Sequence, residues 1–303
     1  MTRTPQIGFL PDGRRLHLQD GPIDLIVEAR GSARDLRAAY QAAARRFAGL
    51  LDELCSELKL LRQPADPGQN PLQGNVARRM HAAVAPFAAD CFITPMAAVA
   101  GAVAEEILGA MLREAELSRA YVNNGGDIAL HLVDGEPFVV GLAERPDASG
   151  LMRTMIIDAE DPSRGVATSG RHGRSFSLGI ADAVTVLAPT ASLADAAATI
   201  IANAVDLPGH PAIIRCPAHD LQPDSDLGAR LVTRGVGELA AREIEHALES
   251  GAAGALKLLA SGLIDGAALR LQGEMVIVGT KAIEMPGLPA PLRGRALEGA
   301  MHV

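Results

Sequence analysis

Apolar positions along the chain follow two different periods. From Ile23 to Ala29 they alternate as in a strand, whereas from Ala33 to Leu61 they recur every three to four residues with Arg and Glu on the opposite face. Between them, residues 30–32 (RGS) supply a turn and a helix N-cap. The pattern predicts a strand followed by one long amphipathic helix, or by two.

A second helix is expected after a segment rich in proline and glycine. Residues 62–74 predict an exposed loop, which is either a lid or a simple connector. Beyond it, Thr94 and Pro95 form a helix start, with an N-cap hydroxyl and proline at the first helical position. The helix expected over 96–117 is almost wholly apolar before Glu105, so it should be buried at its N-terminus, where free N–H groups favour an anionic ligand.

Short alternating segments joined by tight turns fill the middle of the chain and predict antiparallel strands. Helices are expected over 192–205 and near 236–250 and 252–263, before a last strand over 274–279. We therefore predict an α+β fold with largely antiparallel sheets and long helices packed on them, as a single domain over 1–303 or as two intertwined lobes. The strands predicted for the middle of the chain are 120–123, 128–133, 138–143, 154–157, 165–169 and 183–187.

Composition adds constraints to this pattern. The 303 residues are 48% hydrophobic and 21% charged, as in a globular domain, and with no Trp, two Tyr and six Phe the core must be built from small and aliphatic side chains. The net charge is -8, and the basic residues do not gather into a stripe. Both features argue against a nucleic-acid partner. Cys55, Cys91 and Cys216 have no CxxC spacing, so we expect no disulfide framework and favour a reducing compartment.

No segment is expected to enter a membrane or to direct export. The most membrane-like stretch, 82–104, contains Pro86, Asp90 and Pro95, and a central Asp costs about 3 kcal/mol on insertion scales. The first 21 residues carry charges and proline but no apolar signal core. We therefore expect a cytoplasmic protein, and a homo-oligomer remains open.

Four short segments in a fixed order carry the strongest chemical signal. They are 94–106 (TPMAAVAGAVAEE), 122–128 (VNNGGDI), 166–170 (VATSG) and 184–199 (VTVLAPTASLADAAAT). This ordered set, which spans roughly residues 23–206, resembles the ApbE-like superfamily, whose founding members are magnesium-dependent FAD:protein FMN transferases. The resemblance implies a T-fold-related arrangement, magnesium and FAD or FMN as cofactors, and a small-molecule nucleotide or flavin as partner.

The helix expected from Ser192 carries a candidate catalytic and cation half-site. Asp195 and Thr199 are four residues apart, so their oxygens lie on one face and suit a hard cation such as magnesium. The resemblance implies that the backbone oxygen of Ala97 completes the site. The alternative is that Ser192 and Asp195 form a variant capping box and that Thr199 is an ordinary surface or core residue. The two long helices should lie side by side, with small residues at their contact: Ala97, Gly101, Ala194 and Ala198.

Two glycine-containing turns are candidates for holding the flavin or nucleotide. Residues 123–127 (NNGGD) join two strands, and consecutive glycines let the backbone approach a ligand closely. The resemblance implies that this turn lines the flavin-nucleotide pocket; the alternative is a β-bulge or a plain hairpin turn. Residues 168–170 (TSG) run into 171–174 (RHGR), where hydroxyls, glycine N–H groups and two guanidinium groups could hold phosphate oxygens; the alternative is a mobile turn whose arginines face water. The full set of expected cofactor contacts is Gly101, Asn124, Gly125, Gly126, Asp127, Thr168, Ser169, Gly170 and Arg171.

Three departures from the transferase pattern bear on the activity. Ala100 precedes Gly101 where the transferases carry Lys, residues 175–182 replace their His-x-x-Asp-Pro-x-Thr-Gly segment, and the usual lipoprotein signal is missing. The sequence thus suits a cytoplasmic branch of the superfamily with either of two functions. One is a magnesium-dependent flavin- or nucleotide-handling transferase or hydrolase, and the other is a non-catalytic binding or accessory protein. A family-level association with sulfur assimilation would give Cys216 or Cys91 a role.

A second polar cluster lies outside the resemblance. Cys216, His219, Asp220, Asp224 and Asp226 fall within eleven residues, but a C-x-x-H pair alone is a poor metal signal because zinc needs further ligands. The last two carboxylates resemble turn residues, with Asp226 a cap for the helix-like segment 227–232. A metal site or a redox-active Cys216 is the less favoured interpretation.

Overall fold

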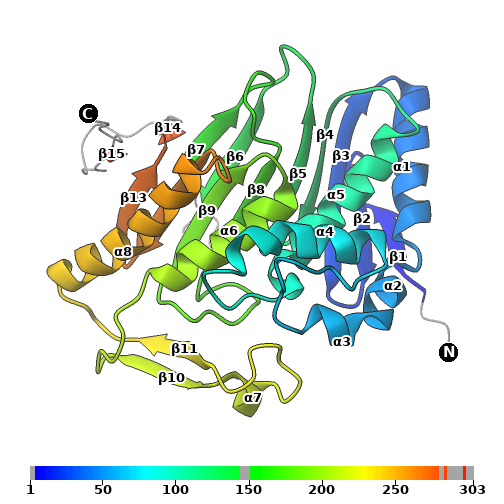
Figure 1. Cartoon of the computed structure of the whole chain (residues 1–303). Helices are drawn as coiled ribbons and strands as arrows, with labels where there is room; N and C mark the ends of the chain where they lie inside the picture. The colour runs from blue at the N-terminus through cyan, green and yellow to red at the C-terminus, as the bar shows by residue number, and fades with distance from the viewer. Residues whose placement is uncertain (1–3, 144–150, 280–282, 285–295, 298–303) are drawn as a thin grey trace. The chain divides into compact units, whose positions relative to one another are not determined.

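The computed structural model describes residues 4–143, 151–279, 283–284 and 296–297 (Figure 1). The chain forms two compact units. Unit 1 comprises residues 1–136, 162–167 and 189–196, and unit 2 comprises 137–161, 168–188 and 197–303. The boundaries fall inside strand β8 (Gly165–Ser169) and helix α6 (Ala191–Ala204), so each unit contains part of both elements.

Unit 1 contains an antiparallel sheet in which strands that are adjacent in sequence are also neighbours in space. Its strands are β1 (Gln6–Phe9), β2 (Leu16–Asp20), β3 (Ile23–Gly31), β4 (Leu117–Asn124) and β5 (Asp127–Leu132). They pair in that order, and β5 continues the ladder to β8 through Ile128 opposite Val166. Alternate residues of β2 and β3 are buried, as the two-residue period of a strand requires. The antiparallel pairing predicted for the strands in the middle of the chain is confirmed for β4, β5 and β8.

The segment 33–61, predicted as one amphipathic helix or two, forms three helices in unit 1. The helices of this unit are α1 (Ala33–Phe47), α2 (Leu50–Ser56), α3 (Leu58–Leu61), α4 (Asn75–Val84) and α5 (Val99–Leu112), with 3-10 turns η1 (Ala85–Phe87) and η2 (Pro95–Ala98). Gly49 takes φ +83, a left-handed conformation that ends α1 and redirects the chain. The predicted loop 62–74 lies between α3 and α4 and is mostly exposed, with Leu72 buried at 2% exposure.

Helix α5 is the central helix of unit 1. It packs against β4 and β5 and lies beside α1, on the same side of the strands (Figure 1). It begins three residues later than predicted, because Pro95–Ala98 forms a 3-10 turn, and it ends at Leu112, because Leu117 already starts β4. Among the described residues, Pro95–Leu112 has the length and apolar character of a membrane span, but most of it is buried, as in the core helix of a soluble domain.

Unit 2 contains further strands, which pair antiparallel except for the parallel pair of β13 and β15, and one long helix, α8 (Ala241–Ala260), which packs against β12 and β13. Two helices were predicted near 236–250 and 252–263, and this prediction is wrong. Val236 ends strand β11, and the single helix α8 covers 241–260. The strands are β6 (Phe138–Ala143), β7 (Leu151–Ile157), β9 (Ala183–Ala188), β10 (Ile213–Pro217), β11 (Leu231–Val236), β12 (Gly266–Leu271), β13 (Glu274–Val278), β14 (Ile283–Glu284) and β15 (Ala296–Leu297), and a short helix α7 spans Ala218–Leu221.

Candidate functional site

The start of α6 lies in backbone contact with α5 and β8. A Cβ added to Gly101 on α5 would lie 2.2 Å from the carbonyl oxygen of Ala191, and one added to Gly165 on β8 would lie 2.2 Å from that of Thr190. Only glycine permits both approaches, because neither neighbour is a side chain that could rotate away. The predicted side-by-side packing of the two helices is therefore confirmed at Gly101.

Each of the two helices caps the N-terminus of the other. Asp195 of α6 accepts a hydrogen bond from the backbone N–H of Gly101 (3.0 Å), within the first turn of α5. In return, Glu105 of α5 accepts from the backbone N–H (2.6 Å) and the hydroxyl (2.8 Å) of Ser192, within the first turn of α6. Carboxylates at these positions satisfy free N–H groups and favour the positive end of each helix dipole.

This crossing overturns the capping-box alternative for Ser192 and Asp195. The helix begins at Ala191, and the backbone N–H of Leu193 donates to the hydroxyl of Thr190 (3.3 Å), so Thr190 acts as the N-cap. The carboxylate of Asp195 points to α5 instead of folding back on its own helix. The carboxylate of Asp195 therefore lies on the face of α6 that meets α5, where it accepts backbone hydrogen bonds.

The β4–β5 turn reaches the same place on α5. Gly125 and Gly126 have φ +67 and +113, as the two central residues of a type I′ hairpin turn require, and Asn124 pairs with Asp127 across it. The buried amide of Asn124 donates to the carbonyl oxygen of Ala100 (3.2 Å). The plain hairpin turn is therefore the backbone conformation, and its side chains contact the first turn of α5.

The electrostatics of the cluster centre on Asp195. Burial raises the pKa of this carboxyl well above its ordinary value, and the neighbouring Asp127 carboxylate raises it further. Hydrogen bonds from the backbone N–H groups of Gly101 and Ala100 act in the opposite direction without cancelling the rise. Two adjacent carboxylates in a partly buried position are more stable with a cation beside them, since opposite charge favours their ionised forms.

The donor set at this cluster fits a hard cation. Mg²⁺ prefers oxygen ligands and keeps several waters, and Asp195 and Asp127 supply two carboxylates. Within the described ranges no group of three or more His, Cys, Asp or Glu side chains is placed to hold a metal, so further ligands would be hydroxyl, carbonyl or water oxygens. Ala97 lies in η2, immediately before α5, and Thr199 lies one helical turn beyond Asp195 on α6, partly buried.

Residues 7–277 match the family model described as "AbpE bacteria". The chain belongs to this ApbE-like family. Three archaeal relatives carry the name UPF0280 protein. That of Methanococcoides burtonii is 40% identical over 120 residues, covering 39% of this chain and 48% of the relative. That of Methanosphaerula palustris is 39% identical over 145 residues, covering 47% of this chain and 56% of the relative. That of Methanocella arvoryzae is 38% identical over 163 residues, covering 53% of this chain and 63% of the relative. The chain spans about half the length of the curated relatives it matches.

In this ApbE-like protein, three of the four motif segments meet in unit 1. Gly101, the 124–127 turn and Asp195 lie together through the hydrogen bonds and charge interaction described above. The remaining segment, 166–170, is divided between the units: residues 168–170 belong to unit 2, together with Arg171, and are described there by themselves.

The strand-end segment of unit 2 is held by its own contacts. The hydroxyls of Thr168 and Thr185 are 2.9 Å apart, and Gly170 comes so close to the backbone of Asp182 that a Cβ would lie 2.6 Å from its carbonyl oxygen. Arg171 does not simply face water, since two of its guanidinium nitrogens contact the Asp182 carboxylate at 2.8 and 2.6 Å. Any phosphate bound here would therefore share the arginine with Asp182. Ser169 is partly buried at the end of β8.

Cys216 and its polar neighbours are not among any group of three or more His, Cys, Asp or Glu side chains placed to hold a metal within the part of the chain that the structure describes. Cys216 lies on β10, His219 and Asp220 are neighbours on α7 with 3.2 Å between ring nitrogen and carboxylate, and the three cysteines are free. The predicted helix over 227–232 is wrong, because Leu231 begins β11.

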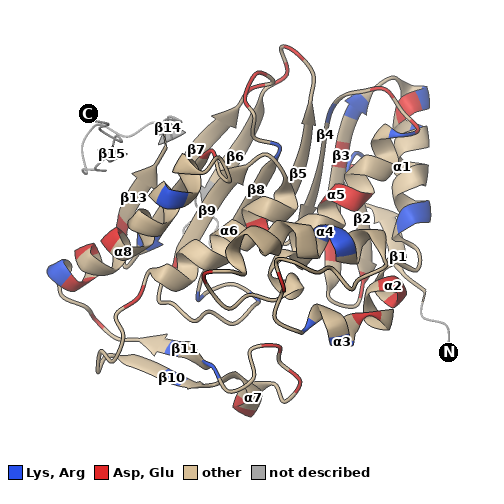
Figure 2. Ribbon diagram, viewed as in Figure 1, with Lys and Arg blue, Asp and Glu red and all other residues tan. Residues whose placement is uncertain are grey.

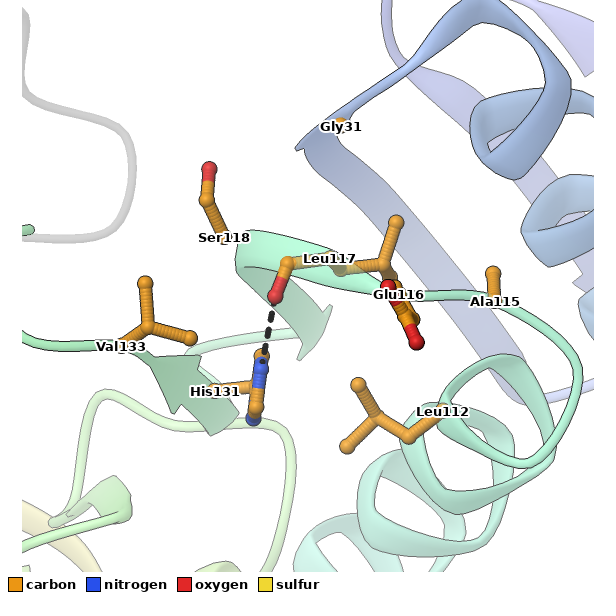
Figure 3. A pocket seen from close by; sticks show the side chains of 8 residues that line it. All are labelled: Gly31, Leu112, Ala115, Glu116, Leu117, Ser118, His131 and Val133. Carbon is orange, nitrogen blue, oxygen red and sulfur yellow. Dashed lines mark hydrogen bonds between the residues drawn. The ribbon is translucent and has the colours of Figure 1, made fainter.

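A hollow of about 490 Å³ in unit 1 is lined by residues outside the four motif segments (Figure 3). It is found at the C-terminal end of α5, where Leu112 and Leu117 line it and His131 contacts the carbonyl oxygen of Leu117 (2.9 Å). Gly101 lies eleven residues earlier on the helix, about 16 Å away at 1.5 Å per residue. The predicted site is thus a polar contact between elements, and the hollow is a separate, mainly aliphatic surface.

Two residues that organise the site were not predicted for that role. Glu105 was noted only as the start of the polar part of its helix, and Gly165 only as the first residue of a strand. The spacing of four between Gly101 and Glu105, in an otherwise apolar helix, is the signal that could have identified the carboxylate. The role of Gly165 depends on the packing of a distant segment and has no local signal.

Proposed function

We propose that this ApbE-like protein is a magnesium-dependent, flavin- or nucleotide-handling transferase of the cytoplasm. The observation that carries the proposal is the meeting of Asp195, Asp127 and the first turn of α5, since these groups come from three motifs of the ordered set. The raised pKa of Asp195 supports a nearby cation, because a positive charge would offset the cost of ionising two adjacent carboxylates.

The residues of the chain would divide the work as follows. Asp195 and Asp127 hold the cation, with the hydroxyl of Thr199 and the carbonyl oxygen of Ala97 as further ligands. Asn124, by its bond to Ala100, fixes the hairpin turn so that the backbone at Gly125 and Gly126 can approach the flavin or nucleotide. A bound Mg²⁺ would neutralise the negative charge that develops on a pyrophosphate. Within unit 2, Thr168, Ser169, Gly170 and Arg171 are proposed by themselves as a group that could contact phosphate.

Incubating the purified protein with FAD and Mg²⁺ tests this function. We expect the melting temperature to rise by a few degrees, since a ligand at 100 times its Kd stabilises the native state by about 2.7 kcal/mol. We also expect AMP to be released as the pyrophosphate bond of FAD breaks and the FMN group passes to a hydroxyl acceptor or to water. One control contains FAD and EDTA, and the other contains Mg²⁺ without FAD. A melting temperature unchanged by FAD, FMN and ATP, together with an absence of AMP, would contradict the proposal.

A second function, nucleotide binding without transfer, is favoured by one observation. Both backbone groups of Ala100 are used, the N–H toward Asp195 and the carbonyl toward Asn124, but its side chain is only a methyl group where transferases carry Lys. In that case the same incubation would raise the melting temperature without releasing AMP.

A further inference from the structure

The carboxylate of Glu105 is fully engaged between two elements. Its Oε1 accepts from the backbone N–H and hydroxyl of Ser192, and its Oε2 lies 3.1 Å from Nε of Arg79 on α4. The side chain of Glu105 is 19% exposed, and it contacts Ser192 and Arg79. Hydrogen bonds to a charged group of this kind are stronger than those between neutral groups, and a fixed partner holds them in one geometry.

These contacts close a ring between the two helices. Glu105 follows Gly101 by four residues on α5, and Asp195 follows Ser192 by three residues on α6, so each pair lies on one face of its helix. Glu105 binds Ser192, and Asp195 binds Gly101. The position of Asp195 on the first turn of α5 therefore depends on the contact that Glu105 makes one turn away.

We propose that Glu105 is a positioning residue, which acts through Ser192 and α6 to hold Asp195 at the cation site. This inference rests on the proposed function for its consequence in binding, but its structural part can be measured without any ligand. Residues that orient a metal ligand without touching the metal typically change metal affinity by about 10- to 100-fold when they are removed.

The adjacent residue provides a matched control. Glu106 also lies on α5 and also pairs with Arg79 (2.9 Å), but its other partner is Arg46 of α1 (2.6 Å). Figure 2 shows that α5 carries acidic residues and that α4 carries basic ones. The contacts of Arg79 on α4 with Glu105 and Glu106 connect the two helices. Burial raises the pKa of Glu106, but hydrogen bonds from both arginines outweigh it and lower the pKa. Removing Glu106 should therefore weaken the same ion-pair cluster without loosening α6.

Hydrogen exchange of the full-length protein in EDTA tests the structural part. In E105A, the amides of Ala100 and Gly101, followed in peptides from the first turn of α5, should exchange about 10-fold faster, because Asp195 no longer holds them. E105Q should restore most of the protection, since its amide oxygen still accepts from Ser192. E106A should lower the melting temperature but leave these two amides unchanged relative to the rest of α5. Equal acceleration in E105A and E106A, or none in either, would overturn the inference.

Calorimetric titration with Mg²⁺ alone tests the consequence for the site. We expect E105A to bind Mg²⁺ at least about 10-fold more weakly than the unmodified protein, and E106A to bind it within about twofold. If the unmodified protein binds no Mg²⁺, the proposed function fails, while the hydrogen-exchange comparison still decides whether Glu105 positions Asp195. If E105A exchanges faster at Gly101 but binds Mg²⁺ normally, the positioning role at the cation site is wrong.

Discussion

Replacing Gly101 by alanine should lower the free energy of unfolding by about 3 kcal/mol, at the upper end of the usual cost of overpacking. The added Cβ would lie 2.2 Å from the carbonyl oxygen of Ala191 and 2.7 Å from the backbone nitrogen of Ser192. Because both atoms belong to the backbone of α6, the clash can be relieved only by moving one helix away from the other. Unfolding in urea, followed by circular dichroism, measures the effect.

Gly109 on the same helix is the matched control for this substitution. Its added Cβ would meet only the end of the Arg113 side chain, at 3.4 Å, which can move at little cost. Gly109→Ala should therefore be neutral or stabilise the protein by up to about 1 kcal/mol, the difference in helix propensity between the two residues. Equal stability of the two variants would mean that α5 and α6 do not approach each other as described.

Replacing Asp195 by alanine should abolish Mg²⁺-dependent flavin or nucleotide binding, with a loss of about 100-fold or more in Mg²⁺ affinity when a carboxylate ligand is removed. The effect on folding should be small, because two contributions oppose each other. Loss of the cap on α5 costs about 1 kcal/mol, whereas removal of the charge beside Asp127 favours the folded state. Titration with Mg²⁺ and urea unfolding measure the two effects separately.

Asp134→Ala controls for a general effect of losing one negative charge. Asp134 is exposed between β5 and β6, so its removal should change neither stability nor Mg²⁺ affinity by a measurable amount. A weakening of binding in both variants to the same extent would show that net charge, not a ligand contact at Asp195, determines the affinity.

Local patterns in the sequence predicted most elements of this fold. The strands over 138–143 and 165–169 were predicted with their observed ends, because turn residues bound each of them closely. Helix ends were less accurate: nothing near Ala48 marks a stop except Gly49, whose positive φ appears only in the structure. The strands β1 and β2 and the helix α4 were not predicted at all, since their short apolar patterns lie among polar residues.

The candidate site shows a different limit of sequence analysis. The identity of Asp195 and the 124–127 turn followed from the ordered motifs, and the small size of Gly101 indicated a close contact. The motifs could not show where the side chain of Asp195 points. Whether it caps its own helix or contacts α5 depends on how the two helices pack, which is visible only in the structure. The reciprocal contact of Glu105 with Ser192 lies 87 residues apart in the chain and has no local signature.

The central claim is that Asp195, at the N-terminus of α5, holds a divalent cation. Anomalous diffraction from crystals soaked in Mn²⁺ and FAD tests it most directly, because Mn²⁺ takes the same oxygen ligands as Mg²⁺. We predict a peak at coordination distance from a carboxylate oxygen of Asp195, with Asp127 beside it and a flavin phosphate within reach. A map with no peak there, in which Asp195 still accepts hydrogen bonds from Gly101 and Ala100, would contradict the account.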